Sequence, residues 1–186
     1  RNVIKVKTKL IGQFNFENIL AAITVTDSLN LNQNKIIKAI STFKGIKRRI
    51  EKIADKKNII IFDDFAQSSN RIKSTLEAIH SHYPKKNIKV LYQPHASFLQ
   101  YKNSLEDFKK AFQLATEVVL TKLNYKINVD KNNRTTASDF IKIIGKKLKY
   151  IPIDKDVINF YKQNLKKEDV LINMSSGGSD GNKIVK

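Results

Sequence analysis

The sequence predicts an α/β fold, in which a mostly parallel sheet carries helices on both faces and follows a small α/β segment. After Arg49, short apolar runs alternate with stretches of helical periodicity. The run at 59–62 is apolar at every position, which is typical of a strand buried on both faces. The 186 residues are 41% apolar and 28% charged, which is a globular composition. Strands and helices alternating at this spacing favour parallel strands joined by crossover helices.

The first part of the chain is predicted to form a unit of its own. Its expected elements are a strand that begins at Val3 and ends at Gly12, a helix over 15–29 and a second helix from Asn32 to Ile40. The strand is predicted from alternating apolar residues, and Asn32 is a residue type that caps helices. Phe43-Lys44-Gly45 then interrupts the pattern. We therefore expect one domain segment over 1–46 and a second over 47–186.

The second part is predicted to contain the parallel sheet. Its expected strands cover 59–62, 88–92, 118–120 and 170–173, and its expected helices cover 70–81, 105–114, 136–148 and 154–165. In sheets of this kind, ligands bind beyond the carboxyl ends of the strands. Three polar segments follow such ends, namely Asp63-Asp64, Pro94-His95 and Ser175 to Gly181.

The chain is strongly basic, with 35 basic and 17 acidic residues and a net charge of +18. Such a charge can indicate a polyanionic partner such as nucleic acid. Most of the basic residues are lysines spread along the whole chain, because arginine occurs only at 1, 48, 49, 71 and 134. The lysines are not interleaved with aromatic residues, so a nucleic-acid-binding module remains the less favoured alternative.

Several classes of protein are excluded by what the sequence lacks. It has no cysteine, which excludes disulfides and cysteine nucleophiles. No apolar run approaches the ~20 residues that span a bilayer, so we expect a cytoplasmic protein with no membrane partner. The alternating residues at the very start predict that an N-terminal part lies outside this sequence. The Gly145-Lys146 pair lacks the other residues of a phosphate-binding P-loop, so the chain does not bind ATP in that manner.

The residues after the strands allow more than one interpretation. Asp63 and Asp64 could bind a sugar hydroxyl or a metal, or could cap the helix that follows. His95 could act as a base or grip a ligand, or could simply face solvent. His80 and His82 lack further ligands nearby in the sequence, so no metal site is predicted.

Two further segments also leave alternatives open. The adjacent guanidinium groups of Arg48 and Arg49 suit stacking on a base or binding a phosphate, and an ion pair between domains is equally compatible. Residues 175–178 (SSGG) could form an anion-binding nest or a plain terminal turn.

Five motifs in order resemble the C-terminal portion of the Mur ligases. Residues 12–22 (GQFNFENILAA) resemble the family's G-x-H-N-x-x-N-x-x-A-A helix start, and residues 43–51 (FKGIKRRIE) are similar to its F-x-G-V-x-R-R-x-E hinge. Residues 63–66 (DDFA), 93–95 (QPH) and 174–178 (MSSGG) resemble the starts of D-D-Y/F-A-H-H-P and Q-P-H-R and the closing M-S-N-G-G. Each motif alone is weak, but together they cover essentially the whole chain.

The resemblance implies an ATP-dependent amide-bond-forming ligase of peptidoglycan synthesis. Segment 1–46 would be the tail of a central ATPase domain, and segment 47–186 would be the C-terminal domain. The implied substrates are UDP-N-acetylmuramate and L-alanine, or alternatively a recycled tripeptide in place of L-alanine. ATP and Mg would be held mainly by upstream ATPase and UDP-sugar domains, so the chain alone is expected to be inactive. A catalytically degenerate member of the family is a further alternative.

The resemblance also implies roles for particular residues. The predicted nucleotide-binding residues are Asn15, Asn18, Arg49 and Asp64, and the predicted acceptor-binding residues are Phe65, Gln67 and His95. Asn15 and Asn18 would contact adenine, Arg49 the nucleotide and Asp64 the ribose. Amides can read a base edge, and a carboxylate accepts hydrogen bonds from ribose hydroxyls. No catalytic or metal-binding residue is assigned within this chain.

The departures from the family's motifs lie mostly on the acceptor side. Gln67-Ser68-Ser69 stand in place of His-His-Pro, and Ala96 and Leu99 stand where the family has arginines. On the nucleotide side, Phe14 replaces a histidine. Without the arginines, a carboxylate would lose charge-assisted hydrogen bonds worth about 1.5–3 kcal/mol each. The sequence therefore predicts either a different acceptor or a weakened activity.

Overall fold

The computed structural model describes residues 5–99, 105–125 and 134–176. The chain divides into two compact units, residues 1–46 and residues 47–186, which are described separately below. None of the helices in the described ranges combines the length and apolar character needed to cross a lipid bilayer.

Unit 1 contains two helices, α1 (Gln13–Ser28) and α2 (Gln33–Thr42). Gly12 precedes α1 with φ 97°, a left-handed conformation that glycine adopts without strain. The side chain of Asn32 accepts a hydrogen bond from the Lys35 N–H at 3.2 Å, which confirms the predicted cap of α2. No residue of unit 1 within the described range is buried.

The predicted N-terminal strand falls partly outside the described residues, which begin at residue 5. Within the described part, residues 5–12 form no strand, so the prediction is wrong there. A strand is stable only when a neighbour pairs with its backbone, and the described part of unit 1 contains no second strand.

Unit 2 is built on a six-stranded sheet with the order β1-β2-β6-β3-β4-β5. The strands are β1 (Glu51–Lys56), β2 (Ile59–Asp64), β3 (Asn87–Gln93), β4 (Glu117–Leu120), β5 (Leu148–Tyr150) and β6 (Asp169–Ser175). Only β1 runs antiparallel to its neighbour, and every other pair is parallel. This confirms the predicted mostly parallel sheet.

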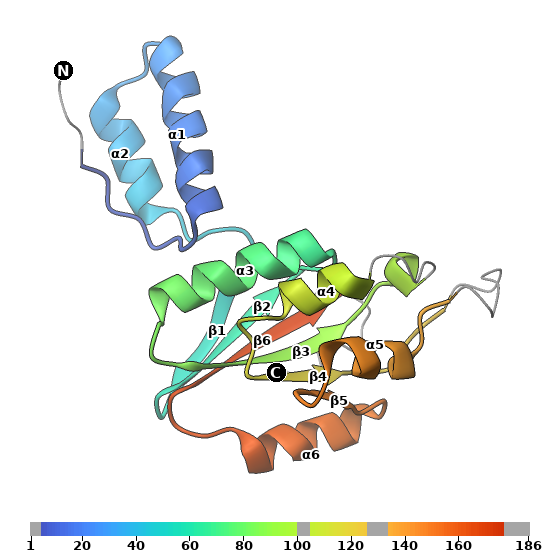
Figure 1. Ribbon diagram of the computed structural model, residues 1–186. Helices are drawn as coiled ribbons and strands as arrows, with labels where there is room; N and C mark the ends of the chain where they lie inside the picture. Colours follow the sequence, from blue (N-terminus) through green and yellow to red (C-terminus); the bar gives the residue numbers. More distant parts are fainter. Residues whose placement is uncertain (1–4, 100–104, 126–133, 177–186) are drawn as a thin grey trace. The chain divides into compact units, whose positions relative to one another are not determined.

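Helices cover both faces of this sheet, as predicted (Figure 1). The helices are α3 (Ser69–His82), α4 (Leu105–Ala111), α5 (Ala137–Ile144) and α6 (Asp154–Asn164), with a short 3₁₀ helix, η1, at Ala96–Leu99. On one face, an aromatic cluster joins β3 to α4 and α5 through Tyr92, Phe108, Phe112 and Phe140. On the other face, α6 packs Val157 and Tyr161 against Leu91, Val119 and Leu171.

The prediction from the sequence omitted two strands, β1 and β5, and made two helices too long. Strand β1 is mostly half-buried or exposed and lies at the edge of the sheet, so it carries no continuous apolar run. The helix predicted over 136–148 ends at Ile144, because Gly145 adopts φ 81° and the chain then enters the three-residue strand β5. The helix predicted over 105–114 ends at Ala111.

Candidate functional site

Polar side chains gather at the carboxyl edge of the sheet in unit 2. Asp63 is in register with Asn173, and Gln93 is in register with Ser175, so β2, β6 and β3 end beside one another. The buried polar residues of this edge are Asp63, Asp64, Gln67, Gln93, Thr121, Asn173 and Ser175. Burying polar groups costs free energy unless they are paired. A set of buried polar residues at the carboxyl edge of a parallel sheet therefore indicates a ligand-binding surface.

Arg48 is bound within this edge. Its Nε atom lies 3.3 Å from Asp63 Oδ2, and its Nη2 atom donates to the carbonyl oxygen of Ser175 and to Ser175 Oγ at 3.0 Å. The guanidinium also lies over the Phe65 ring, with Cζ 5.1 Å from the ring centroid. The ion pair of Arg48 therefore lies inside unit 2, contrary to the interpretation that it joins two domains.

The residues on either side of Arg49 are anchored to the end of β2. Arg48 and Ile50 both adopt positive φ, at 59° and 48°, which is uncommon outside glycine. The Phe65 N–H donates to the Arg48 carbonyl at 2.9 Å, and the Ile50 N–H donates to Asp64 Oδ2 at 2.7 Å. These bonds hold a strained turn that leaves the Arg49 side chain exposed.

Asp64 is almost completely buried, with 1% of its surface exposed. Burial raises the pKa of its carboxyl to about 6, although the Ile50 N–H, the charge of Arg49, the Ala66 N–H and the Thr75 hydroxyl all oppose that rise. Its Oδ1 atom makes no hydrogen bond of good geometry to any described residue. The structure thus places the charge of Arg49 where it acts on Asp64, whose Oδ1 atom is a buried acceptor oxygen.

Gln67 and His95 lie together beside the end of β3, whereas Phe65 follows β2 and its ring lies against Arg48. Gln67 is buried, and its Oε1 atom accepts a hydrogen bond from the His95 N–H at 2.7 Å. Its carbonyl accepts from the Tyr92 hydroxyl at 3.0 Å, which ties this loop to the aromatic core. The exposed His95 ring places Nδ1 2.7 Å from Ser97 Oγ, and Phe65 is 37% exposed.

Sequence reasoning missed Thr121, and it named Gln93 only within a motif, without a role at this edge. Each directly follows the apolar part of a strand, which is the signal that could have identified them. The Thr121 N–H donates to the Tyr92 carbonyl at 3.0 Å. Gln93 Oε1, Thr121 Oγ1 and Gln67 Nε2 are buried and make no hydrogen bond to the described residues. These atoms can therefore form hydrogen bonds with a polar ligand.

Asn15 and Asn18 lie near the start of α1 in unit 1. Asn15 is half-buried and donates from Nδ2 to the Ile11 carbonyl at 2.7 Å, whereas Asn18 is exposed. Residues three apart on a helix are neighbours on its surface, so both amides can face one ligand. Their participation in one site with Arg49 and Asp64 stays a prediction, because the two units are described separately.

The described residues offer no group of three or more His, Asp or Glu side chains able to hold a metal ion. The ring of His82 instead packs edge-on against Tyr83, with centroids 4.6 Å apart. Gly177 and Gly178 of the predicted anion nest lie outside the described residues, and Ser175 is the buried last residue of β6.

The parallel sheet and its polar carboxyl edge define a ligand-binding α/β domain. The family model described as "Mur ligase, glutamate ligase domain" matches residues 48–177. The chain therefore belongs to the Mur ligase family, whose members are ATP-dependent ligases, and the resemblance inferred from the motifs is confirmed.

Known proteins similar to this chain share its fold over nearly its whole length. A UDP-N-acetylmuramate–L-alanine ligase of Lachnoclostridium phytofermentans is 33% identical over 94% of this chain, which covers 37% of that relative. The crystal structure of a UDP-N-acetylmuramate-alanine ligase from Thermotoga maritima is 25% identical, with a TM-score of 0.77 over 100% of this chain and 40% of that one. A murein peptide ligase from Psychrobacter arcticus, 22% identical with a TM-score of 0.67, shares the fold over 97% of this chain and 38% of its own.

Proposed function

We propose that the chain is the C-terminal part of an ATP-dependent ligase that joins L-alanine to UDP-N-acetylmuramate. The observation that carries this proposal is that, at the carboxyl edge of unit 2, the charge of Arg49 acts on the buried carboxylate of Asp64. A cation beside an acceptor oxygen suits a nucleotide, which presents both phosphate charge and ribose hydroxyls. The relatives named for this reaction support the choice of substrates.

In the proposed site, Asp64 Oδ1 accepts a hydrogen bond from a ribose hydroxyl and Arg49 offsets phosphate charge. Asn15 and Asn18 supply amide groups for the adenine. Phe65, Gln67 and His95 line the side where the acceptor amine enters. ATP supplies the phosphoryl group that converts the substrate carboxylate to an acyl phosphate. The acceptor amine then attacks the acyl carbon, phosphate leaves, and an amide forms with loss of the amine proton.

Unit 1 is proposed to be the tail of a central ATPase domain. Apolar side chains lie around much of α1, and Phe16, Leu20 and Val25 are each more than half exposed. A helix that is apolar on several sides is typical of one covered by neighbouring elements. The chain also spans 37% of the relative from Lachnoclostridium phytofermentans, which leaves room for upstream ATPase and UDP-sugar domains. We assign Mg to those domains, because the described residues include no suitable cluster of carboxylates.

The test is phosphate release from ATP by the full-length protein that contains this chain. We expect release that requires both UDP-N-acetylmuramate and L-alanine, and none from residues 1–186 alone. The Arg49→Ala variant is expected to raise the KM for ATP about tenfold or more, from the loss of a charge-assisted contact. Lys47→Ala removes a neighbouring exposed charge and is the matched control.

The same assay separates the rival acceptor. Faster turnover with a tripeptide than with L-alanine would replace the proposed activity with peptide attachment to the same sugar nucleotide. Absence of release with either acceptor would contradict both and would favour a degenerate family member.

A further inference from the structure

The predicted acceptor residues contain no permanent cation. Phe65, Gln67 and His95 present a ring, an amide and an imidazole, and Gln67 Nε2 is a buried donor without a described partner. An acceptor such as L-alanine carries a carboxylate beside its amine. A carboxylate taken out of water needs a charged partner or several hydrogen bonds, because unpaired burial of a charge is costly.

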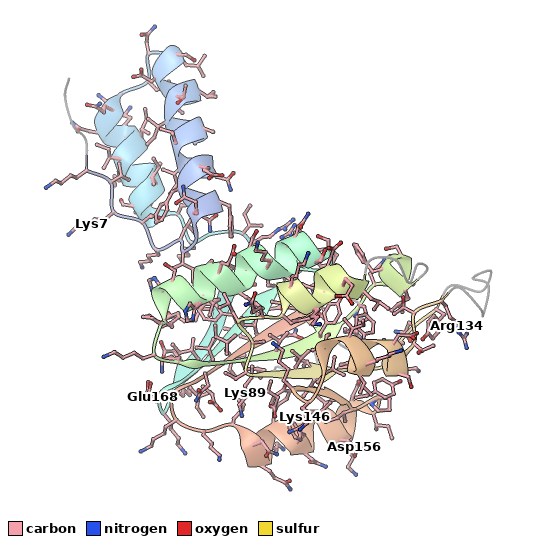
Figure 2. The ribbon with its side chains drawn as sticks, viewed as in Figure 1. Lys7, Lys89, Arg134, Lys146, Asp156 and Glu168 are labelled. Atoms are coloured by element: carbon pink, nitrogen blue, oxygen red, sulfur yellow. The ribbon has the colours of Figure 1, made fainter. Side chains whose placement is uncertain are left out.

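A guanidinium group lies on a different segment of the chain, the connection between β4 and α5. Arg134 precedes α5 in the connection that leaves the carboxyl end of β4, and Figure 2 shows it beside the start of α5. The next residue, Thr135, donates its N–H to the Leu99 carbonyl at 2.8 Å. Leu99 ends η1, which begins directly after His95. At about 2 Å of rise per residue in a 3₁₀ helix, this anchor lies roughly 8 Å from His95 along η1.

The orientation of Arg134 is set by Tyr125. The guanidinium Cζ lies 4.5 Å from the centroid of the Tyr125 ring. The Tyr125 hydroxyl donates to the Thr135 carbonyl at 2.8 Å, which fixes the ring under the cation. A stacked guanidinium keeps the N–H donors in its plane free to bind a carboxylate with two parallel hydrogen bonds. Because the side chain is already ordered, binding costs less conformational entropy.

Arg134 is also not engaged in an ion pair with the described residues. No carboxylate of the described ranges lies within ion-pair distance of it, whereas Arg48 is bound to Asp63 and Ser175. The nearby Asp139 carboxylate is occupied by the capping box of α5, where its Oδ2 atom accepts from the Thr136 N–H at 2.8 Å and the Thr136 hydroxyl at 2.7 Å.

We propose that Arg134 binds the carboxylate of the acceptor and so selects acceptors that carry a free carboxylate next to the reacting amine. Gln67 Nε2 is a neutral donor among the predicted acceptor residues. This inference rests on the proposed function. Ala96 and Leu99 carry no positive charge. The inference assigns that charge to Arg134, which lies 35 residues beyond Leu99.

The test compares L-alanine with L-alaninamide, which has the amine but no carboxylate, in the full-length protein. We expect Arg134→Ala to raise the KM for L-alanine about 10- to 100-fold, as for loss of a charge-assisted contact. The KM values for L-alaninamide and ATP should stay unchanged. Arg134→Lys keeps the charge but loses the planar stacked fork, so its KM for L-alanine should be intermediate. Lys146→Ala removes an exposed charge elsewhere in unit 2 and is the matched control.

Equilibrium binding of both compounds, measured by calorimetry, separates this inference from the proposed function. If no acceptor supports phosphate release, the proposed function fails. The role of Arg134 is then still supported when the parent protein binds L-alanine more tightly than the amide and Arg134→Ala loses that preference. The role is overturned if the parent shows no preference, or if Arg134→Ala and Arg134→Lys both keep it while their thermal unfolding matches the parent.

Discussion

The two units of the chain differ in how much of their apolar surface they bury. In the described part of unit 1 no residue is buried, and Leu20 and Leu29 are each 64% exposed. In unit 2 the aromatic residues Tyr92, Phe108 and Phe112 are at most 2% exposed. Hydrophobic burial is the main favourable contribution to folding, so unit 2 has the means to fold alone and unit 1 does not.

This difference also separates two kinds of binding residue. Arg49, Asp64, Gln67 and His95 are placed by a sheet whose strands hold one another in register. The amides of α1 are placed by a two-helix unit that lacks a core of its own. A rigid support holds ligand-binding groups at low entropic cost, so the geometry of unit 2 is preformed while that of unit 1 depends on further protein.

The largest expected effect comes from separating the units. Residues 47–186 alone should unfold cooperatively with heat, whereas a peptide of residues 1–46 should be largely unfolded, because short helices without tertiary packing are marginal in water. Circular dichroism over a temperature range measures both. Cooperative melting of the 1–46 peptide would contradict the comparison.

A smaller effect is expected from removing one aromatic ring in each unit. Phe108→Ala should lower the free energy of unfolding of unit 2 by about 3–5 kcal/mol, because it leaves a cavity beside Tyr92 and Phe140. Phe16→Ala in α1, where the ring is 51% exposed, should change it by less than about 0.5 kcal/mol. Urea unfolding followed by tyrosine fluorescence measures both changes. Equal losses for the two variants would show that unit 1 contributes to the same core.

The smallest expected effect concerns Asp64 and pH. Its pKa rises from 3.8 to about 6 on folding, so between these values the folded state keeps a proton that the unfolded state releases. The carboxyl therefore favours folding less as pH rises through this window, and the loss relative to Asp64→Asn reaches about 3 kcal/mol by pH 7. Urea unfolding from pH 4 to 7 measures the difference between the two proteins.

Asp27→Asn, an exposed position of unit 1, is the control for this pH comparison. It should leave the pH dependence of unit 2 as it is in the parent. Curves for the parent and Asp64→Asn that stay parallel across the pH range would show that burial of Asp64 is not what stabilises its proton.

Local patterns predicted the parts of the fold that carry strong local signals. Strands β2 and β6 each contain a continuous apolar run, at 59–62 and 170–172, and α2 has a capping residue at its start. Strands β1 and β5 were missed because both lie at the edges of the sheet and are largely exposed or short. An edge strand is stabilised by its one neighbour, and that pairing leaves little trace in its own sequence.

By itself, the sequence determined the mostly parallel α/β fold and the segments that follow its strands, since both depend on local periodicity and on turn residues. Only the tertiary structure decided which of those residues meet. The bond from Arg48 to Ser175 spans 127 residues, and Thr135 reaches Leu99 across the end of the sheet. Such contacts follow from the strand order β2-β6-β3-β4, which is set by packing between segments far apart in the chain.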